Sequence, residues 1–199
     1  MNDSLSASIH ELQRMFNYFN QQIYNSELKK PVFIIASRRN AYGWCSTGKV
    51  WSVGQEKNYE VGITAEFLNR PYEEIAETIM HEMVHLYNLQ NGVKDCSNNV
   101  HNKKFKAEAE RRHLKVEKMG RYGWAHTSLT DVSKEIISGF DGDESMFNLF
   151  RLTPEKPQKE KQKPFRYFCP KCGAKVTSKE EIQATCKKCT VDFITKEAI

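Results

Sequence analysis

The residues with the clearest chemical potential lie in the segment His81-Glu82-Met83-Val84-His85. Two histidines four positions apart on a helix project from one face, close enough together to bind one tetrahedral metal ion. Glu82 borders the same face, so its carboxylate can reach a water on that metal without becoming a ligand itself. The spacing therefore predicts a catalytic zinc site in which Glu82 is the general base.

A catalytic zinc site needs a third protein ligand and leaves its fourth position to water. We expect His101 to be this ligand, because the sixteen positions from His85 to His101 leave room for a loop that returns to the helix. The main alternative is a glutamate on the following helix, and Glu108 is the better candidate there. Tyr122 or His126 could donate to an oxyanion, although no spacing rule places either side chain near the metal.

A second group of ligands lies near the end of the chain, where two Cys-x-x-Cys pairs are separated by thirteen residues: Cys169, Cys172, Cys186 and Cys189. Each pair forms a tight turn that offers two thiolates, and together they predict a four-cysteine zinc site. Because four protein ligands leave no open position, this zinc is structural, and its binding folds the small unit that carries it. The sequence thus predicts two zinc ions, one catalytic and one structural.

The helices that must position these ligands can be recognised from the sequence pattern. Apolar side chains at steps of three and four predict a first helix that runs to about residue 27: Ile9, Leu12, Phe16, Phe19 and Ile23. The metal helix begins near Pro71, which suits a first helical position, and ends at Asn91-Gly92, a C-terminal capping signal. A third helix is expected from about residue 102 to 113, whereas the pattern between residues 115 and 150 is weak.

Short strands are expected at residues 32–36, 42–46, 50–53 and 59–64. We expect strand 59–64 to form the exposed edge of the sheet, because it directly precedes the metal helix. An extended peptide substrate would then add to this edge.

The positive charge of the chain lies almost entirely behind residue 151. Residues 1–151 hold 19 Lys and Arg against 19 Asp and Glu, whereas residues 152–199 hold 11 against 6 and carry the net charge of +5. The boundary falls in a stretch rich in proline and charge, which cannot bury enough apolar surface to fold. We therefore predict a domain at residues 1–151, a linker at 152–164 and a zinc ribbon at 165–199.

The basic ribbon and linker are candidates for contact with DNA or RNA. Four ribbon lysines could contact phosphates: Lys171, Lys175, Lys187 and Lys188. Three aromatic residues could stack on exposed bases: Tyr167, Phe168 and Phe193. The alternative is that these aromatic side chains form the small core of the ribbon and that the lysines are solvated.

No feature of the sequence predicts export or membrane insertion. An acid stands where a signal peptide would carry bases, and the longest aliphatic run, residues 32–36, is far too short to span a bilayer. We therefore expect a cytoplasmic protein without a membrane partner, in which paired cysteines bind metal more often than each other.

The run from Arg70 to His85, followed by His101 and Phe105, resembles the SprT-like (Spartan-type) zinc metalloprotease family. The resemblance covers about residues 8–130 and extends to a C-terminal zinc ribbon that many short bacterial or phage-type members share. It implies that His81, His85 and His101 are zinc ligands and that Glu82 is the catalytic acid and base. It also implies DNA-associated or crosslinked protein substrates, in a stress-response or DNA–protein crosslink repair context.

The sequence therefore predicts an α+β protein: a small zincin-like metalloprotease domain, with helices packed on a short mixed or antiparallel sheet, and a small four-cysteine zinc ribbon. The predicted function is hydrolysis of peptide bonds in protein substrates. Two alternatives remain open. One is a regulatory protease that cleaves a specific repressor, and the other is a non-catalytic zinc-binding adaptor for nucleic acid.

Overall fold

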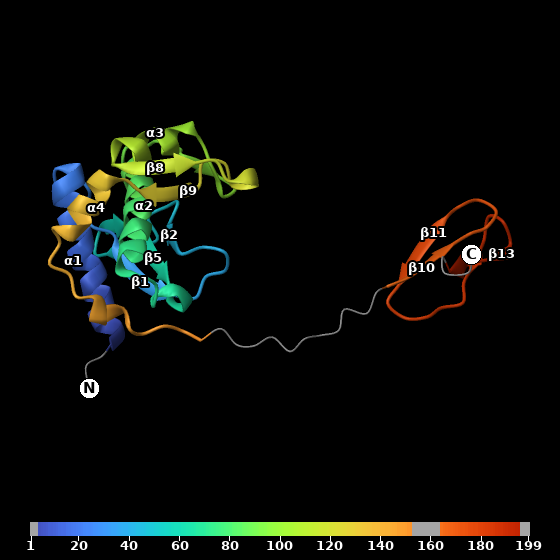
Figure 1. The fold of residues 1–199 in the computed structure, drawn as a ribbon. Coiled ribbons are helices and arrows are strands. Elements are labelled where there is room, and N and C mark those ends of the chain that lie inside the picture. The colour runs from blue at the N-terminus through green and yellow to red at the C-terminus, as the bar shows by residue number, and fades with distance from the viewer. Residues whose placement is uncertain (1–3, 153–163, 196–199) are drawn as a thin grey trace. The chain divides into compact units, whose positions relative to one another are not determined.

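The structure, a computed structural model, describes residues 4–152 and 164–195 (Figure 1). The chain divides into two compact units, Met1–Thr153 and Pro154–Ile199. Nearly all of the predicted linker at residues 152–164 lies outside the described residues, so its predicted extended form stays a prediction. Among the described residues, no helix has the length and apolar character needed to cross a membrane.

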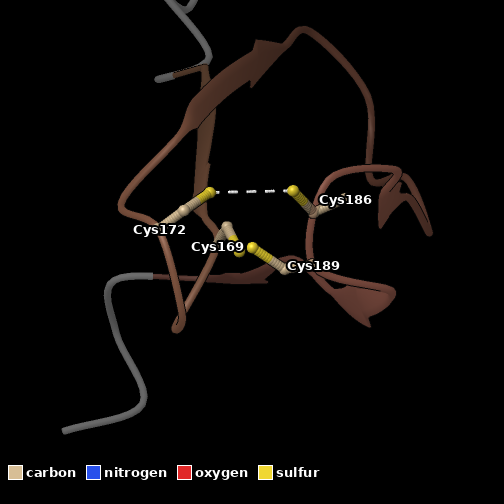
Figure 2. Close-up of side chains that lie close together, drawn as sticks. All are labelled: Cys169, Cys172, Cys186 and Cys189. Atoms are coloured by element: carbon tan, nitrogen blue, oxygen red, sulfur yellow. Dashed lines mark hydrogen bonds between the residues drawn. The ribbon is translucent and has the colours of Figure 1, made fainter.

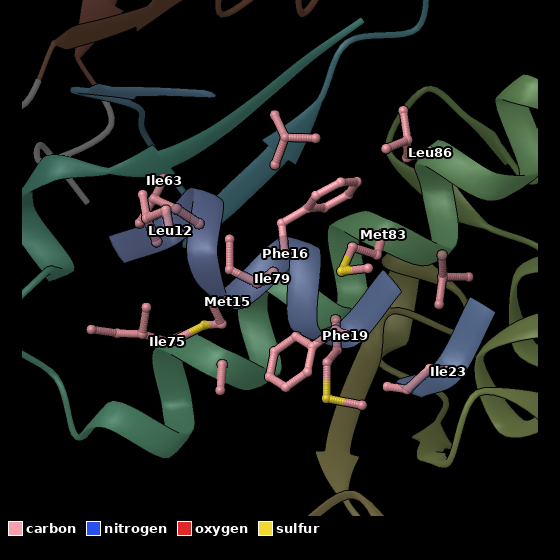
Figure 3. Close-up of a cluster of buried hydrophobic side chains, with 14 of the residues drawn as sticks. Leu12, Met15, Phe16, Phe19, Ile23, Ile63, Ile75, Ile79, Met83 and Leu86 are labelled. Carbon is pink, nitrogen blue, oxygen red and sulfur yellow. The ribbon is translucent and has the colours of Figure 1, made fainter. Parts of the chain in front are cut away.

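The first unit is a mixed α+β structure built around α2 (Tyr72–Gln90), which contacts α1 (Ser4–Tyr24) and the sheet (Figure 1). The apolar stripe of α1 faces the core as predicted, and its members Leu12, Phe16 and Phe19 are at most 1% exposed (Figure 3). On α2 the buried residues Ile75, Ile79 and Met83 pack into the same cluster. The metal helix is therefore held rigidly by the main core.

Both helix ends show why the chain turns where it does. Helix α1 ends at Tyr24, three residues before its predicted end, because Asn25 and Ser26 adopt positive φ angles of 51° and 62°. Helix α2 ends as predicted, with Gly92 at φ 70° and a hydrogen bond from Val93 N–H to the Asn88 carbonyl at 2.7 Å. Pro71 is the residue before the first helical position of α2, one place earlier than predicted.

A mixed sheet of three strands covers one side of α2, in the order β1 (Val32–Ala36), β5 (Glu60–Thr64) and β2 (Gly43–Cys45). Strand β5 pairs in parallel with β1 and antiparallel with β2. The prediction that residues 59–64 form the sheet edge is therefore wrong. The strand order places β5 in the centre and leaves β2 as the edge strand that contacts the metal helix. Between β2 and β5 the chain forms a short hairpin in which β3 (Trp51–Val53) pairs with β4 (Glu56–Asn58).

The polar segment after α2 is an ordered hairpin of two short strands, β6 (Cys96–Ser97) and β7 (Val100–His101). Its two-residue turn, Asn98 and Asn99, has φ angles of 50° and 62°. Positive φ at both central residues defines the type I′ turn that suits a tight hairpin. The hairpin delivers the chain directly to α3 (Lys103–Arg111).

The chain after α3 returns to α2 through two strands and a helix. Strand β8 (Leu114–Glu117) pairs antiparallel with β9 (His126–Leu129), and β9 contacts α2. Helix α4 (Asp131–Ser138) follows, and it also contacts α2. Three short 3-10 turns complete the unit: Ala65–Phe67, Gly120–Tyr122 and Glu144–Phe147.

The second unit is a small β structure. Strand β10 (Phe165–Phe168) lies between β11 (Lys175–Ser178) and β14 (Ile194–Thr195), antiparallel to both. A second pair is formed by β12 (Thr185–Cys186) and β13 (Val191–Asp192). Each pair of strands begins or ends at a Cys-x-x-Cys turn, and this arrangement is compatible with a zinc ribbon.

Candidate metal centres

The structure brings three histidines together, two from α2 and one from β7. The Nε2 atom of His101 lies 3.0 Å from Nε2 of His85 and 3.3 Å from Nε2 of His81. One ligand atom from each of the three lies within 4.8 Å of the others, so the group could hold a metal ion. The predicted proximity of His101 to the helix histidines is therefore present in the structure.

The separation of these nitrogens fits zinc. In a tetrahedral site with zinc–nitrogen distances of about 2.0–2.1 Å, two ligand nitrogens lie about 3.3 Å apart. The distances of 3.0 and 3.3 Å are close to this edge length. Three imidazoles as the protein donors would leave one tetrahedral position open, as a catalytic zinc site requires.

Phe105 forms the floor of the histidine cluster. Its fully buried ring lies 4.7 Å from the ring centroid of His81, 4.6 Å from that of His85 and 4.6 Å from that of His101. Phe105 comes from the first turn of α3, four residues after His101. A single aromatic ring therefore packs against all three imidazoles. The sequence pattern does not reveal this role of Phe105.

The backbone of His101 is fixed on both sides. On one side it pairs with Cys96 across the β6–β7 hairpin. On the other, its carbonyl accepts a hydrogen bond from Trp124 N–H at 3.0 Å. Gly123 makes this close approach feasible, because a Cβ atom at that position would lie 2.2 Å from the His101 carbonyl oxygen. Gly123 also has a φ of 70°, which favours glycine.

Hydrogen bonds on the outer nitrogens orient the two helix histidines. Nδ1 of His85 lies 2.8 Å from the Asp95 carboxylate, which also accepts a hydrogen bond from Asn88. Nδ1 of His81 lies 3.2 Å from the Thr127 hydroxyl. By contrast, the buried Nδ1 of His101 has no side-chain partner within the described residues, and the polar group that acts on this imidazole is the Tyr122 backbone. Sequence reasoning missed Asp95, Asn88 and Thr127, since only the folded chain brings them to the histidines.

Glu82 lies where the free edge of β2 meets α2. A Cβ atom on Gly43 would lie 3.2 Å from Cγ of Glu82 and 2.8 Å from the Thr78 side chain, so only glycine permits this approach. Gly43 and Cys45 alternate along β2 with residues that bond to β5, so their N–H and C=O groups point away from β5. The structure thus places the edge strand beside the predicted general base, and the Cys45 backbone N–H donates a hydrogen bond to the Glu82 carboxylate.

Burial dominates the acid–base properties of the cluster. It raises the pKa of Glu82 to about 7, against the opposing effect of His85. Burial, together with the neighbouring imidazoles, lowers the pKa of His81 well below its usual range and that of His101 to about 4. For His85, burial alone would lower the pKa, but the hydrogen bond to Asp95 and the charges of Glu82 and Asp95 raise it. Neutral imidazoles are the form that binds metal.

No other candidate from the sequence has a side chain that bonds to the three histidines among the described residues. The Glu108 carboxylate binds the Arg112 guanidinium at 2.6 Å, so the structure does not bring this alternative ligand to the cluster. The Tyr122 hydroxyl accepts a hydrogen bond from Arg121. The side chain of His126 is 57% exposed. Neither Tyr122 nor His126 makes a side-chain hydrogen bond to the cluster among the residues that the structure describes.

The four ribbon cysteines form the second candidate centre (Figure 2). Their sulfur atoms lie within 4.8 Å of one another, and Sγ of Cys172 is 3.7 Å from Sγ of Cys186. Zinc–sulfur distances of about 2.3 Å give a tetrahedral edge of about 3.8 Å. The cysteines are free thiols in the structure. Burial raises the pKa of the Cys169 thiol, but hydrogen bonds from the Cys172 and Lys171 backbone and from the Cys172 and Cys186 side chains outweigh it and lower this pKa to about 7.

The two Cys-x-x-Cys turns have the same backbone form but different residues. Gly173 follows the first Cys-x-x-Cys pair with a φ of 71°, and Thr190 follows the second with a φ of 54°. In both turns this residue donates its N–H to the carbonyl of the first cysteine of the pair. A β-branched residue is strained in this left-handed conformation, whereas glycine is not.

The structure separates the ribbon residues proposed for nucleic-acid contact into two groups. The lysines are exposed: Lys171, Lys175, Lys187 and Lys188. Tyr167, in contrast, is 5% exposed and its hydroxyl accepts a hydrogen bond from Ile182 N–H, so it belongs to the ribbon core and cannot stack on a base. Phe168 and Phe193 are half-buried, and the more open aromatic is Phe165, which is 40% exposed.

The fold and the histidine cluster together define an α+β protein with a His-x-x-x-His metal helix, of the metallopeptidase type. The model of the SprT-like family matches residues 12–120, more than half of the chain, and the protein belongs to this family. A search among curated proteins found no match. The match includes all three histidines and Glu82, and ends before Gly123 and Thr127.

Proposed function

We propose that this protein is a zinc-dependent metallopeptidase in which His81, His85 and His101 hold the catalytic metal and Glu82 is the general base. The observation that carries the proposal is that the His101 nitrogen lies 3.0 Å and 3.3 Å from the nitrogens of two histidines on α2, a helix that also carries the buried Glu82 carboxylate. The four ribbon cysteines would hold a second zinc with a structural role. Membership of the SprT-like family supports the same conclusion.

The residues of the chain divide the reaction between them. When bound, zinc polarises a substrate carbonyl and lowers the pKa of water. Glu82 takes the proton from the attacking water on a carboxylate oxygen and delivers it to the leaving nitrogen of the peptide. The substrate, in extended form, pairs with the edge of β2 at Gly43, whose N–H and C=O groups point away from β5. This binding mode replaces the one expected at residues 59–64.

The test is the Glu82→Gln variant of the full chain, compared with Glu73→Gln, a change at an exposed position on the same helix. Loss of a general base lowers peptide cleavage by about 10²–10⁴-fold. We expect this loss for Glu82→Gln with two zinc ions still bound, and no loss for Glu73→Gln. Casein and a DNA-bound protein, each with and without DNA, serve as substrates. Cleavage by Glu82→Gln would refute the mechanism, and a zinc-loaded wild type that cleaves nothing would favour the adaptor.

For the ribbon we propose contact with nucleic-acid phosphates, which would direct the peptidase to DNA-associated or crosslinked proteins under stress or during repair. Four exposed lysines support it, and none of them forms an ion pair within the described part of the chain: Lys171, Lys175, Lys187 and Lys188. Each phosphate contact contributes about 0.7–0.9 to the slope of log affinity against log salt.

A cleavage pattern confined to one repressor-like substrate would favour the regulatory alternative.

Replacing these four lysines by glutamine tests the ribbon proposal without removing the zinc site. We expect the salt slope of DNA binding to fall by up to about 3. The matched control replaces four exposed lysines of the first unit: Lys49, Lys57, Lys118 and Lys134. An unchanged slope in the ribbon variant, or an equal change in the control, would contradict the proposal.

A further inference from the structure

We propose that Thr127 and Glu77 form a positioning relay that fixes the orientation of the His81 imidazole for metal binding. The inference rests on the proposed metal site at His81, His85 and His101. The Thr127 hydroxyl lies 3.2 Å from Nδ1 of His81 and donates a hydrogen bond to the Glu77 carboxylate at 2.9 Å. Thr127 is 8% exposed, and Glu77 is half-buried one helical turn before His81.

The relay has a direction because a hydroxyl carries one hydrogen. Thr127 donates this hydrogen to the Glu77 carboxylate, which can only accept. The hydroxyl oxygen can therefore only accept from His81, so Nδ1 of His81 must carry the proton. Nε2 of His81 then presents its lone pair toward His85 and His101, and this is the tautomer that a metal ligand needs.

The neighbouring histidine shows the simpler form of the same arrangement. Nδ1 of His85 lies 2.8 Å from the Asp95 carboxylate with no group between them. Each helix histidine is thus backed by a carboxylate, directly for His85 and through a hydroxyl for His81. Among the described residues no carboxylate bonds to His101, and the polar backbone group that acts on its imidazole belongs to Tyr122. Support of an imidazole by a carboxylate is therefore a feature of the two histidines of α2.

The hydroxyl also ties two separate parts of the fold together. Thr127 lies on β9, 46 residues after His81 and 50 after Glu77. Strand β9 packs against α2, so a displacement of the β8–β9 hairpin would move the oxygen that orients His81. Thr127 is not one of the three histidines that could hold the metal, so the role proposed for it is to position a ligand.

The experiment measures metal affinity at the histidine site of the full chain, separately from catalysis. Cobalt(II) distinguishes the two centres, because thiolate ligands give sulfur-to-metal charge-transfer bands that a nitrogen site lacks. Chelator competition then gives the affinity of each centre, and the ribbon centre is the internal reference. Loss of an outer partner of a metal-bound histidine weakens binding by about 10–100-fold.

The variants separate the hydrogen bond from the shape of the side chain. Thr127→Val removes the hydroxyl at nearly constant volume, and we expect a loss of affinity of about 10–100-fold here. Thr127→Ser keeps the hydroxyl and should restore binding. The control is Ser128→Ala on the same strand, whose side chain makes no hydrogen bond to the rest of the described chain. Thermal unfolding of the metal-free forms checks that the fold is intact.

A double variant tests whether Glu77 acts through Thr127. Glu77→Gln alone should weaken binding, but it should add no further loss once Thr127→Val is present. Wild-type affinity in Thr127→Val, or an additive loss in the double variant, would overturn the relay. If Thr127→Val binds metal normally while Glu82→Gln is inactive, the relay fails and the proposed function stands. If the relay variants lose metal but the loaded wild type cleaves no protein, the relay stands and the proposed function fails.

Discussion

Replacing Phe105 by alanine is the most direct probe of how the core supports the histidine cluster. Phe105 is 0% exposed, and its ring lies 4.6–4.7 Å from the centroids of three histidine rings. Truncation of a buried phenylalanine to alanine costs about 3–5 kcal/mol. In a unit of this size, each kcal/mol lowers Tm by about 2–4 °C, so we expect a decrease of about 12 °C in metal-free protein.

A second effect should appear only when zinc is added. A ligand at about 100 times its Kd stabilises the folded protein by about 2.7 kcal/mol. Without Phe105 the three imidazoles lose the aromatic ring against which they all pack. Metal binding must then order the imidazoles, and this lowers the affinity. A tenfold weaker affinity would reduce the zinc-induced stabilisation by about 1.4 kcal/mol. Calorimetric unfolding of metal-free and zinc-loaded samples measures both effects on the first unit.

The matched control is Phe16→Ala on α1. Phe16 is 1% exposed, like Phe105, but its aromatic partner is Phe33 at 5.5 Å. Phe16→Ala should therefore lower the Tm of metal-free protein by a similar amount and leave the zinc-induced increase intact. If zinc stabilises both variants equally, Phe105 is an ordinary core residue and the argument is wrong.

Three further predictions concern single backbone or side-chain features. Thr190→Gly relieves a left-handed residue at φ 54°, which costs about 1–2 kcal/mol, and should raise the zinc affinity of the ribbon by about tenfold in chelator competition. Gly123→Ala places a Cβ atom 2.2 Å from the His101 carbonyl oxygen and should abolish the cobalt spectrum of the histidine site. The hydrogen bond from Ser37 is the main cause that lowers the pKa of Glu66, so the Glu66 contribution to stability is present at neutral pH and is lost as pH falls through the folded pKa. Ser37→Ala should return this pKa toward its usual value in an NMR titration.

Each of these predictions has an internal comparison. Gly173→Ala should weaken the ribbon site, opposite in sign to Thr190→Gly, and equal signs would contradict the strain argument. A Cβ atom at Gly48 would have no atom within 4 Å, so Gly48→Ala should leave the cobalt spectrum of the histidine site unchanged. This variant controls for a general effect of replacing glycine. An unshifted Glu66 titration in Ser37→Ala would show that another group lowers its pKa.

The sequence predicts the candidate metal ligands of this protein better than the residues and strands that position them. The metal helix can be recognised because its histidine spacing, its start near Pro71 and its capping residue Gly92 are local signals. The α+β class and the four-cysteine cluster can also be predicted from local patterns. Each of these signals is local, because it depends on residues within a few positions of one another, such as the two cysteines of one Cys-x-x-Cys turn.

The features that the sequence does not predict depend on distant pairing. Strand β5 was expected at the sheet edge because it precedes α2, but its partners β1 and β2 lie earlier in the chain and enclose it on both sides. The hydrogen bonds of Thr127 to His81 and Glu77 span 46 and 50 residues. The pair Asn98-Asn99 is a local signal for a hairpin that the sequence analysis did not use. Asparagine favours the type I′ turn, and this turn joins β6 to β7, the strand that carries His101.

The ligand hairpin, β6 with β7, has a consequence for insertions and labels. Its base is closed independently of its tip, because Asn102 N–H bonds to the Asp95 carbonyl at 2.9 Å and the Asn102 side chain bonds to Lys94. Residues added in pairs at Asn98-Asn99 would lengthen both strands and keep His101 on the same side of the hairpin. The tip can therefore vary in length, or carry an epitope or a spectroscopic probe, while the distance from His101 to the metal helix stays constant.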